Sequence, residues 1–300
     1  MVEITTQMVK ELRQHTGSPV ALCKEALVAT DGDFQEAELY LRKKDKDRAT
    51  KKSHRATGEG VVLMKIDDDL RKGALIELAC ETDFVARNDR FQALAASLAD
   101  AMLRADKLDD LQALALPEGR TAQAAVHEAV ATIGENIRFR RAAVLEASAG
   151  GRVAGYQHFT NKAASLVALS LEGLDPSAEA VDRLARDLCM HIASARPTGL
   201  TREDIPQDVL AREREVYAEE IQDKPEDIQE RILEGKLSKF YKTRCLNEQG
   251  FVKEEKVQIK DHVARALKDA GGKGAIAGFA RLELGAEPAC VGGTLVQAED

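Results

Sequence analysis

Two segments of the chain carry the same arrangement of hydrophobic residues, 90 or 91 residues apart. Residues 60–79 and 151–170 alternate apolar and polar side chains on both sides of a turn, which predicts a β-hairpin in each. Each hairpin precedes a segment with helical spacing, at residues 91–102 and 181–192. The corresponding leucines are Leu75 with Leu166 and Leu78 with Leu169. This repeat predicts a core of two similar α/β subdomains.

One further strand is expected in each subdomain. Residues 137–145 and 276–284 are rich in apolar side chains and supply these strands. The expected bounds are 58–147 for the first subdomain, 148–206 with 247–285 for the second, and 286–300 for a C-terminal tail.

Residues 1–45 predict three short helices that form a small bundle. Thr5 or Thr6 can cap the first helix, and Gly17 can end it. The expected starts of the other helices are Ser18 followed by Pro19, and Asp33 with Glu36 three residues later. A basic linker is expected at residues 46–57, where lysines and arginines are dense.

An insertion at residues 207–246 precedes the last strand of the second subdomain. Its apolar residues recur at helical spacing on both sides of a turn at Lys224, Pro225 and Glu226. They are Val209, Val216, Ile221, Ile228, Ile232, Leu237 and Phe240. Because apolar stripes need a partner and the adjacent helix is the nearest one, we expect an antiparallel coiled-coil hairpin. The whole chain is therefore predicted to be of the α+β class.

The charge balance bears on the kind of partner. The chain has 43 basic and 51 acidic residues and a net charge of −8, which argues against nucleic acid as the main partner. The basic stretch at residues 42–55 is the exception. It could contact RNA, but two aspartates within it and the lack of aromatic residues favour a solvated linker.

Membrane insertion and secretion are not expected. No apolar run approaches the ~18 residues that a bilayer crossing needs, and the first residues lack the apolar core of a signal peptide. The number of cysteines is odd, and their wide separation is typical of reduced thiols: Cys23, Cys80, Cys189, Cys245 and Cys290. We therefore expect a cytoplasmic protein.

Signatures of an enzyme are scarce. Cys189 and His191 lie in an apolar helical segment without the further ligands that zinc needs, so a buried core pair is favoured. Residues 67–69 are three aspartates, which suit a solvated hairpin turn better than a calcium loop. The glycine-rich residues 271–274 lack the frame of a phosphate-binding loop. The sequence predicts a binding protein without covalent chemistry, metal or cofactor.

Two short segments stand out as candidate contacts. Residues 81–88 lie between the second strand and its helix, where Asp83 could serve a helix N-terminus. The pattern alone favours Phe84 in the local core; the alternative is an aromatic wedge exposed on a rigid turn. Residues 133–137 read as a helix closed by Gly134 before a strand.

The order of several motifs resembles bacterial elongation factor Ts. The N-terminal LRQHTGSPVALCKEAL at 12–27 is similar to the family's LRxxTGxxxxxCKxAL. The other similar segments are 81–85 (QTDFV in the family), 132–141 (IGENIxxRR), 155–158 (xYxH), 225–239 (PEKIxEKIxEGRxxK) and 251–252 (PFV). The resemblance covers almost the whole chain.

This resemblance implies a ubiquitin-associated-like N-terminal domain, the two core subdomains and the inserted hairpin. It implies a nucleotide-exchange factor that binds elongation factor Tu in its GDP-bound and nucleotide-free forms and allows a dimer of heterodimers. A loop of Thr82, Asp83, Phe84 and Val85 is implied to displace the partner's Mg²⁺ and phosphate-site elements. The other implied contacts are Arg13, Val20, Ala21, Ile133, Gly134 and His158. Val20 and Ala21 stand where the family often has methionines, and Gly250 replaces its proline.

Two other functions remain open from the sequence. An RNA-associated translation protein would act through residues 42–55, and its binding would weaken steeply with salt. A hydrolase would need a nucleophile, and no motif in the sequence supplies one.

Overall fold

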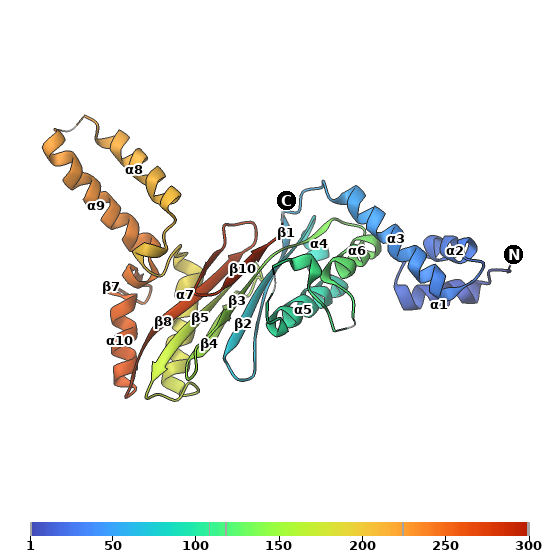
Figure 1. Cartoon of the computed structure of the whole chain (residues 1–300), viewed down its shortest axis with the longest axis horizontal. Helices are drawn as coiled ribbons and strands as arrows, with labels where there is room; N and C mark the ends of the chain where they lie inside the picture. The colour runs from blue at the N-terminus through green and yellow to red at the C-terminus, as the bar shows by residue number, and fades with distance from the viewer. Residues whose placement is uncertain (1, 108, 118, 224, 299–300) are drawn as a thin grey trace. The chain divides into compact units, whose positions relative to one another are not determined.

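The structure is a computed structural model that describes residues 2–107, 109–117, 119–223 and 225–298 (Figure 1). Its contacts divide the chain into two units. The first unit comprises Met1–Val61, Ile76–Arg141 and Val296–Asp300, and the second comprises Val62–Leu75 and Ala142–Leu295. The predicted turn residue Lys224 and the end of the predicted tail, 299–300, lie outside the described residues.

Three helices begin the first unit: α1 (Thr6–Thr16), α2 (Val20–Ala29) and α3 (Phe34–Lys52). The predicted caps Thr5 and Asp33 are confirmed, and Gly17 ends α1 with a φ of 70°. The predicted cap at Ser18 is wrong. Because Pro19 itself occupies the N-cap position of α2, Ser18 lies one residue too early for its hydroxyl to reach the free amides.

Helix α3 extends through residues 46–52, which the sequence predicted as linker. Asp45 and Ala49 on this part of α3 are buried. The guanidinium of Arg48 donates to the carbonyl of Ala131, and the ammonium of Lys52 donates to that of Gly134. These cations bind the unsatisfied carbonyls at the end of another helix, where positive charge is favourable. Most of the basic stretch at residues 42–55 is therefore part of a helix.

The remaining helices of the first unit lie between residues 83 and 133. They are α4 (Asp83–Ala86), α5 (Asp89–Arg104), the 3₁₀ turn η1 (Leu111–Ala113) and α6 (Ala122–Ile133). Helix α5 corresponds to the predicted helix at 91–102 and buries Phe91, Leu94 and Leu98.

Two four-stranded sheets carry the predicted repeat, in the orders β1-β2-β3-β10 and β4-β5-β8-β9. The strands of the first are β1 (Glu59–Ile66), β2 (Lys72–Cys80), β3 (Ile137–Glu146) and β10 (Thr294–Gln297). Those of the second are β4 (Arg152–Gln157), β5 (Ala163–Glu172), β8 (Lys273–Glu283) and β9 (Ala289–Val291). Both predicted hairpins are confirmed, and the described part of the predicted tail adds an edge strand to each sheet.

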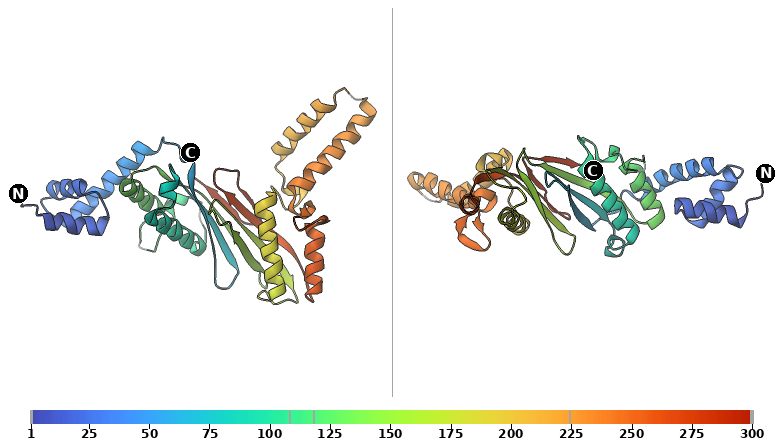
Figure 2. Two further views of the ribbon diagram at one scale, coloured as in Figure 1. Left: turned by 180° about the vertical axis from the view of Figure 1, so that it is seen from behind. Right: turned by 90° about the horizontal axis from the view of Figure 1, so that it is seen from below.

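Two helices, α7 (Glu179–Ala195) and α10 (Ile259–Asp269), cover one face of the second sheet, as Figure 2 shows. Their apolar residues form one core with those of β4, β5 and β8. The opposite face of β4, β5 and β8 packs against apolar residues of the first hairpin and of β3. Gly155 allows this close packing, because a Cβ there would collide with the sulfur of Met64.

The insertion forms the predicted helical hairpin, α8 (Gln207–Ile221) and α9 (Glu226–Arg244) (Figure 1). Its core contains Leu210, Leu237 and Phe240. Val216 and Ile228, which the sequence placed on the inner stripes, are exposed. Tyr217 packs against the hairpin core instead. A small two-stranded sheet, β6 (Gly250–Phe251) and β7 (Glu254–Gln258), follows the hairpin.

Candidate interaction site

Two phenylalanines are exposed to solvent, whereas most phenylalanines of the chain are buried. Phe84 is 82% exposed and Phe159 is 87% exposed. The buried phenylalanines are Phe91, Phe139, Phe240, Phe251 and Phe279. The pattern-based preference for Phe84 in the core is therefore wrong, because the short helix α4 directs its ring to solvent. An exposed aromatic side chain on an ordered turn is a typical anchor of a protein interface.

Helix α4 presents Phe84, and we refer to Thr82, Asp83, Phe84 and Val85 as the tip. Thr82 is the N-cap: its hydroxyl accepts a hydrogen bond from the amide of Val85 at 3.4 Å. Asp83, which the sequence considered as the capping residue, is instead the first residue of the helix. Its carboxylate pairs with Arg87 at 3.2 Å on the exposed surface.

The C-terminal side of the tip is also anchored. Ala86 is buried, and its carbonyl accepts a hydrogen bond of 2.5 Å from the side chain of Gln92. Asn88 then caps α5 by accepting from the amide of Arg90 at 3.0 Å. A cap on each side makes the tip a defined turn of helix rather than a loose loop.

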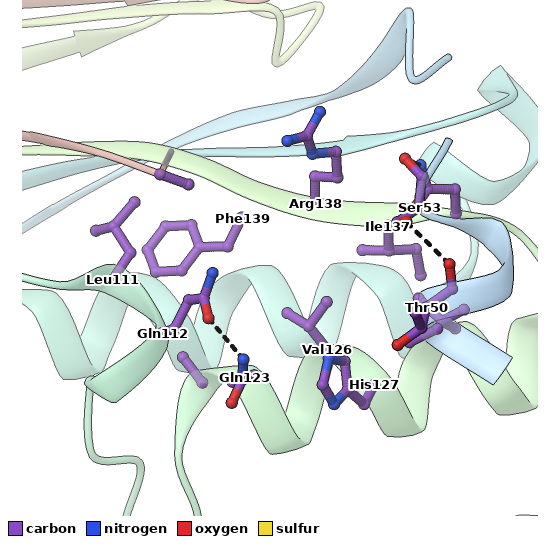
Figure 3. A pocket seen from close by; sticks show the side chains of 15 residues that line it. Thr50, Ser53, Leu111, Gln112, Gln123, Val126, His127, Ile137, Arg138 and Phe139 are labelled. Carbon is purple, nitrogen blue, oxygen red and sulfur yellow. Dashed lines mark hydrogen bonds between the residues drawn. The ribbon is translucent and has the colours of Figure 1, made fainter. Parts of the chain in front are cut away.

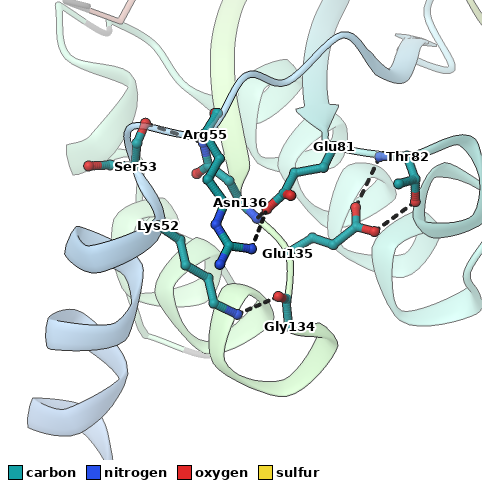
Figure 4. A network of polar contacts seen from close by, with 8 residues as sticks. All are labelled: Lys52, Ser53, Arg55, Glu81, Thr82, Gly134, Glu135 and Asn136. Atoms are coloured by element: carbon teal, nitrogen blue, oxygen red, sulfur yellow. Dashed lines mark hydrogen bonds and ion pairs between the residues drawn. The ribbon is translucent and has the colours of Figure 1, made fainter.

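The segment after α6 meets the base of the tip (Figure 4). The carboxylate of Glu135 accepts one hydrogen bond from the amide of Thr82 at 3.0 Å and one from its hydroxyl at 2.7 Å. Next to it, Gly134 ends α6 with a φ of 97°, as the sequence predicted. Gly134 is exposed, and Ile133 is half-buried. The structure thus brings two of the predicted contact segments together.

The predicted N-terminal contact residues lie at the end of α1 and the start of α2. The side chains of Arg13, Val20 and Ala21 are exposed. Arg13 and Val20 line a groove of about 650 Å³ together with Arg90 of α5 and Thr132 of α6. Because Thr132 directly precedes Ile133, this groove borders the second predicted contact segment.

His158 lies in the second unit, at the turn between β4 and β5. Its Nδ1 atom lies 2.8 Å from the hydroxyl of Thr160, and its ring centroid lies 4.4 Å from that of Phe159. The sequence reasoning identified His158 but missed Phe159. Phe159 could have been found from the sequence, because it follows the alternating pattern of the strand and lies where that strand no longer buries side chains.

A separate cavity of about 260 Å³ lies in the first unit between α6, η1 and β3 (Figure 3). Val126, Phe139 and a hydrogen-bonded pair, Gln112 and Gln123, line it. Burial lowers the pKa of His127 at its side. The lining contains no carboxylate and no cysteine among the described residues, so it offers no acid–base pair for catalysis.

Other chemical candidates from the sequence are structural. Cys189 and His191 are both fully buried, as predicted for a core pair. Asp67 accepts hydrogen bonds from the amides of Arg71 and Lys72 in the first hairpin turn. Within the described ranges no three metal-ligating side chains come together. No helix in the described part of the chain has the length and apolar character of a membrane span.

Comparison with known proteins assigns the family. A model of the family described as "Elongation factor TS" matches residues 81–286. Elongation factor Ts of Chlamydia trachomatis serovar L2 is 39% identical over 276 residues, covering 90% of this chain and 95% of the relative. The protein of the same name from Aquifex aeolicus is 39% identical over 293 residues (94% and 98%), and that from Trichlorobacter lovleyi is 37% identical over 289 residues (94% and 93%). The matched part includes the tip and His158.

Proposed function

Because the chain belongs to the elongation factor Ts family, we propose that it promotes the release of GDP from elongation factor Tu. The observation that carries this proposal is Phe84, an exposed aromatic ring on a tip that is capped at its start and anchored at its end. In this function the chain binds the GDP-bound and the nucleotide-free partner and makes or breaks no covalent bond.

Such a factor acts by differential affinity. It must bind the nucleotide-free partner more tightly than the GDP-bound partner, and GDP must then weaken the factor's binding by the same ratio as the factor weakens GDP. Burial of one phenylalanine contributes about 1.5–3 kcal/mol, which corresponds to roughly a ten- to hundredfold change in an equilibrium. The free energy from burying Phe84 alone is therefore too small to weaken GDP binding by a large factor.

Further contacts supply the rest of the coupling. We assign them to the groove lined by Arg13 and Val20, with Ala21 beside it, to the Ile133–Gly134 segment, and to His158. Phe159 joins His158 in this role, since its ring is exposed and its centroid lies 4.4 Å from that of the imidazole. Surfaces distributed in this way require a chain of several domains.

The tip acts at the partner's metal and phosphate site in this proposal. Mg²⁺ neutralises the diphosphate that a G domain holds, so loss of the metal weakens GDP binding. The Phe84 ring shifts the partner elements that hold Mg²⁺, and the Asp83 carboxylate adds negative charge beside them. Raising the Mg²⁺ concentration should therefore raise the factor concentration that gives half-maximal release.

The basic stretch at residues 42–55 is less available to RNA than its composition indicates. Lys44 pairs with Glu25, and Arg55 pairs with Glu81. Arg48 and Lys52 donate to carbonyls at the end of α6. Cations with partners inside the protein release fewer counterions on binding a phosphate backbone. This supports the partner protein over RNA.

The experiment is stopped-flow release of a fluorescent GDP analogue from elongation factor Tu with and without this protein. We expect release to accelerate with factor concentration and to saturate, and we expect any RNA binding to be weak at moderate salt. Release at the spontaneous rate at every factor concentration would contradict the proposed function. Tight RNA binding with a steep salt dependence would favour the RNA-associated alternative.

A further inference from the structure

We propose that Glu135 is a positioning residue that holds the tip in the orientation needed to present Phe84. This inference rests on the proposed function for its effect on GDP release. The hydrogen bonds between Glu135 and Thr82 are present in the free protein. Glu135 lies 53 residues from Thr82 in the sequence, on the segment between α6 and β3.

The contact is made to the residue that starts the tip. Glu135 accepts from both the amide and the hydroxyl of Thr82, at 3.0 Å and 2.7 Å, so the two bonds fix the Thr82 main chain and side chain together. Hydrogen bonds to an ionised carboxylate are about twice as strong as those between neutral groups. Helix α4 has only four residues, so the orientation of its N-cap sets the direction in which Phe84 points.

The segment that carries Glu135 is itself held on both sides (Figure 4). The amide of Asn136 donates to Glu81 at 2.6 Å, and its side chain donates to the carbonyls of Arg55 at 2.7 Å and Ser53 at 3.3 Å. Lys52 donates to the carbonyl of Gly134. Glu135 therefore extends from a fixed backbone, and the end of α3 supports that backbone.

A positioning role differs from two simpler ones. If Glu135 only stabilised the fold, its loss would lower the melting temperature and leave the release rate of the folded protein unchanged. If Glu135 itself contacted the partner, its loss would slow release whether or not Phe84 was present. A positioning residue acts through Phe84, so its loss has no further effect once Phe84 has been removed.

The test compares Glu135→Ala and Glu135→Gln with Glu128→Gln as a matched control. Glu128 lies on α6, where its carboxylate pairs with Arg120. We expect Glu135→Ala to reduce the maximum GDP-release rate by about tenfold or more, because both charge-assisted hydrogen bonds to Thr82 are lost. Glu135→Gln should lose less because it keeps one acceptor oxygen, and Glu128→Gln should match the wild type.

Two further variants probe the other end of the contact and cover the case in which Glu135→Ala does not fold. Thr82→Val removes the hydroxyl that donates to Glu135 and caps α4, whereas Thr82→Ser keeps it. We expect release to be slower from Thr82→Val than from Thr82→Ser, because only the serine keeps both hydrogen bonds of the hydroxyl. Glu135→Ala in a Phe84→Ala background should release GDP at the rate of Phe84→Ala alone.

Amide hydrogen exchange in the free protein separates this inference from the proposed function. We expect the Thr82 amide to exchange about tenfold faster in Glu135→Ala, because its acceptor is gone. If the wild-type protein does not accelerate GDP release, the proposed function fails while this measurement still decides whether Glu135 holds the tip. Unchanged exchange at Thr82, an unchanged release rate in folded Glu135→Ala, or additive effects with Phe84→Ala would each overturn the inference.

Discussion

The Nε2 atom of His191 lies 2.9 Å from the side-chain oxygen of Gln249, at the base of the helical hairpin. The amide of Val252 donates to Nδ1 of the same ring, so the imidazole is neutral and carries its proton on Nε2. Burial lowers the pKa of His191, in agreement with the neutral form. The Gln249 side chain also donates to the carbonyls of Ala195 and Thr243, which joins the end of α7 to the end of α9.

This anchoring predicts that the hairpin can be removed without unfolding the second unit. We expect a variant in which a Gly/Ser linker replaces residues 208–241 to unfold cooperatively, because Thr243 and Gln249 remain and closing a loop of this size costs little. GDP release should fall about two- to threefold at most, since the charged outer faces suit only a weak contact. Melting temperature and release rate are measured on one preparation. A near wild-type melting temperature with almost no release would make the hairpin a principal contact.

Removal of residues 1–45 should separate binding from folding. The truncated chain keeps Arg48, Lys52 and Asn136, whose hydrogen bonds hold the remaining part of α3 against the end of α6. We expect it to fold, as judged by circular dichroism, but to release GDP far more slowly because Arg13 and Val20 are lost. Full activity of the truncated chain would refute a role of the N-terminal helices in binding.

Asp45 predicts a pH dependence of stability. Asp45 is 5% exposed, and burial together with Glu128 raises the pKa of its carboxyl to about 6, although Arg48 acts in the opposite direction. The unfolded chain releases this proton near pH 4 (about 3.9). The folded protein therefore binds more protons between about pH 4 and 6, and this group's contribution to stability falls as the pH rises through that window.

Asp45→Asn should remove the destabilisation that comes from burying an ionised carboxylate at neutral pH. We expect the variant to exceed the wild type by about 1–2 kcal/mol in free energy of unfolding at pH 7.5 and to match it near pH 4. Urea unfolding at both pH values measures this. Asp47→Asn, an exposed position on the same helix, is the control and should change little. A less stable Asp45→Asn at pH 7.5 would show that the charge of Asp45 is favourable.

The cysteines should be unreactive in the folded protein. Burial raises the pKa of Cys80 to about 12 and those of Cys245 and Cys290 to about 11, and it also raises those of Cys23 and Cys189. Little thiolate is then present at neutral pH. We expect slow labelling by a thiol reagent in buffer, labelling of all five in guanidinium, and release rates independent of reductant. A rapidly labelled thiol in the folded protein would contradict this account.

Local features of the fold could be predicted from the sequence. The two hairpins follow from the alternation of apolar and polar residues, and Gly17 and Gly134 mark helix ends. Both kinds of feature depend mainly on residues close together in the sequence. Helix α10 is absent from the predictions, although Ile259, Val263 and Leu267 lie about one turn apart and are buried. The helical spacing of these three residues is visible in the sequence, so α10 could have been predicted.

Other features depend on contacts between distant residues. The pairing of β10 with β3 and of β9 with β8 joins segments whose short strands carry little pattern of their own. The burial of Ala86 and the exposure of Phe84 depend on how helix α4 packs in the folded chain, which the local sequence pattern does not specify. The two hydrogen bonds from Thr82 to Glu135 likewise became visible only in three dimensions.

The central claim, that the tip drives GDP release, is tested most directly by Phe84→Ala. The Phe84 side chain is 82% exposed, so its loss should leave the melting temperature unchanged. We expect the maximum rate of GDP release from elongation factor Tu to fall about ten- to a hundredfold, the equivalent of one buried phenylalanine. Phe84→Leu serves as the conservative control and should retain part of the activity. A Phe84→Ala variant that folds normally and releases GDP at the wild-type rate would contradict the account.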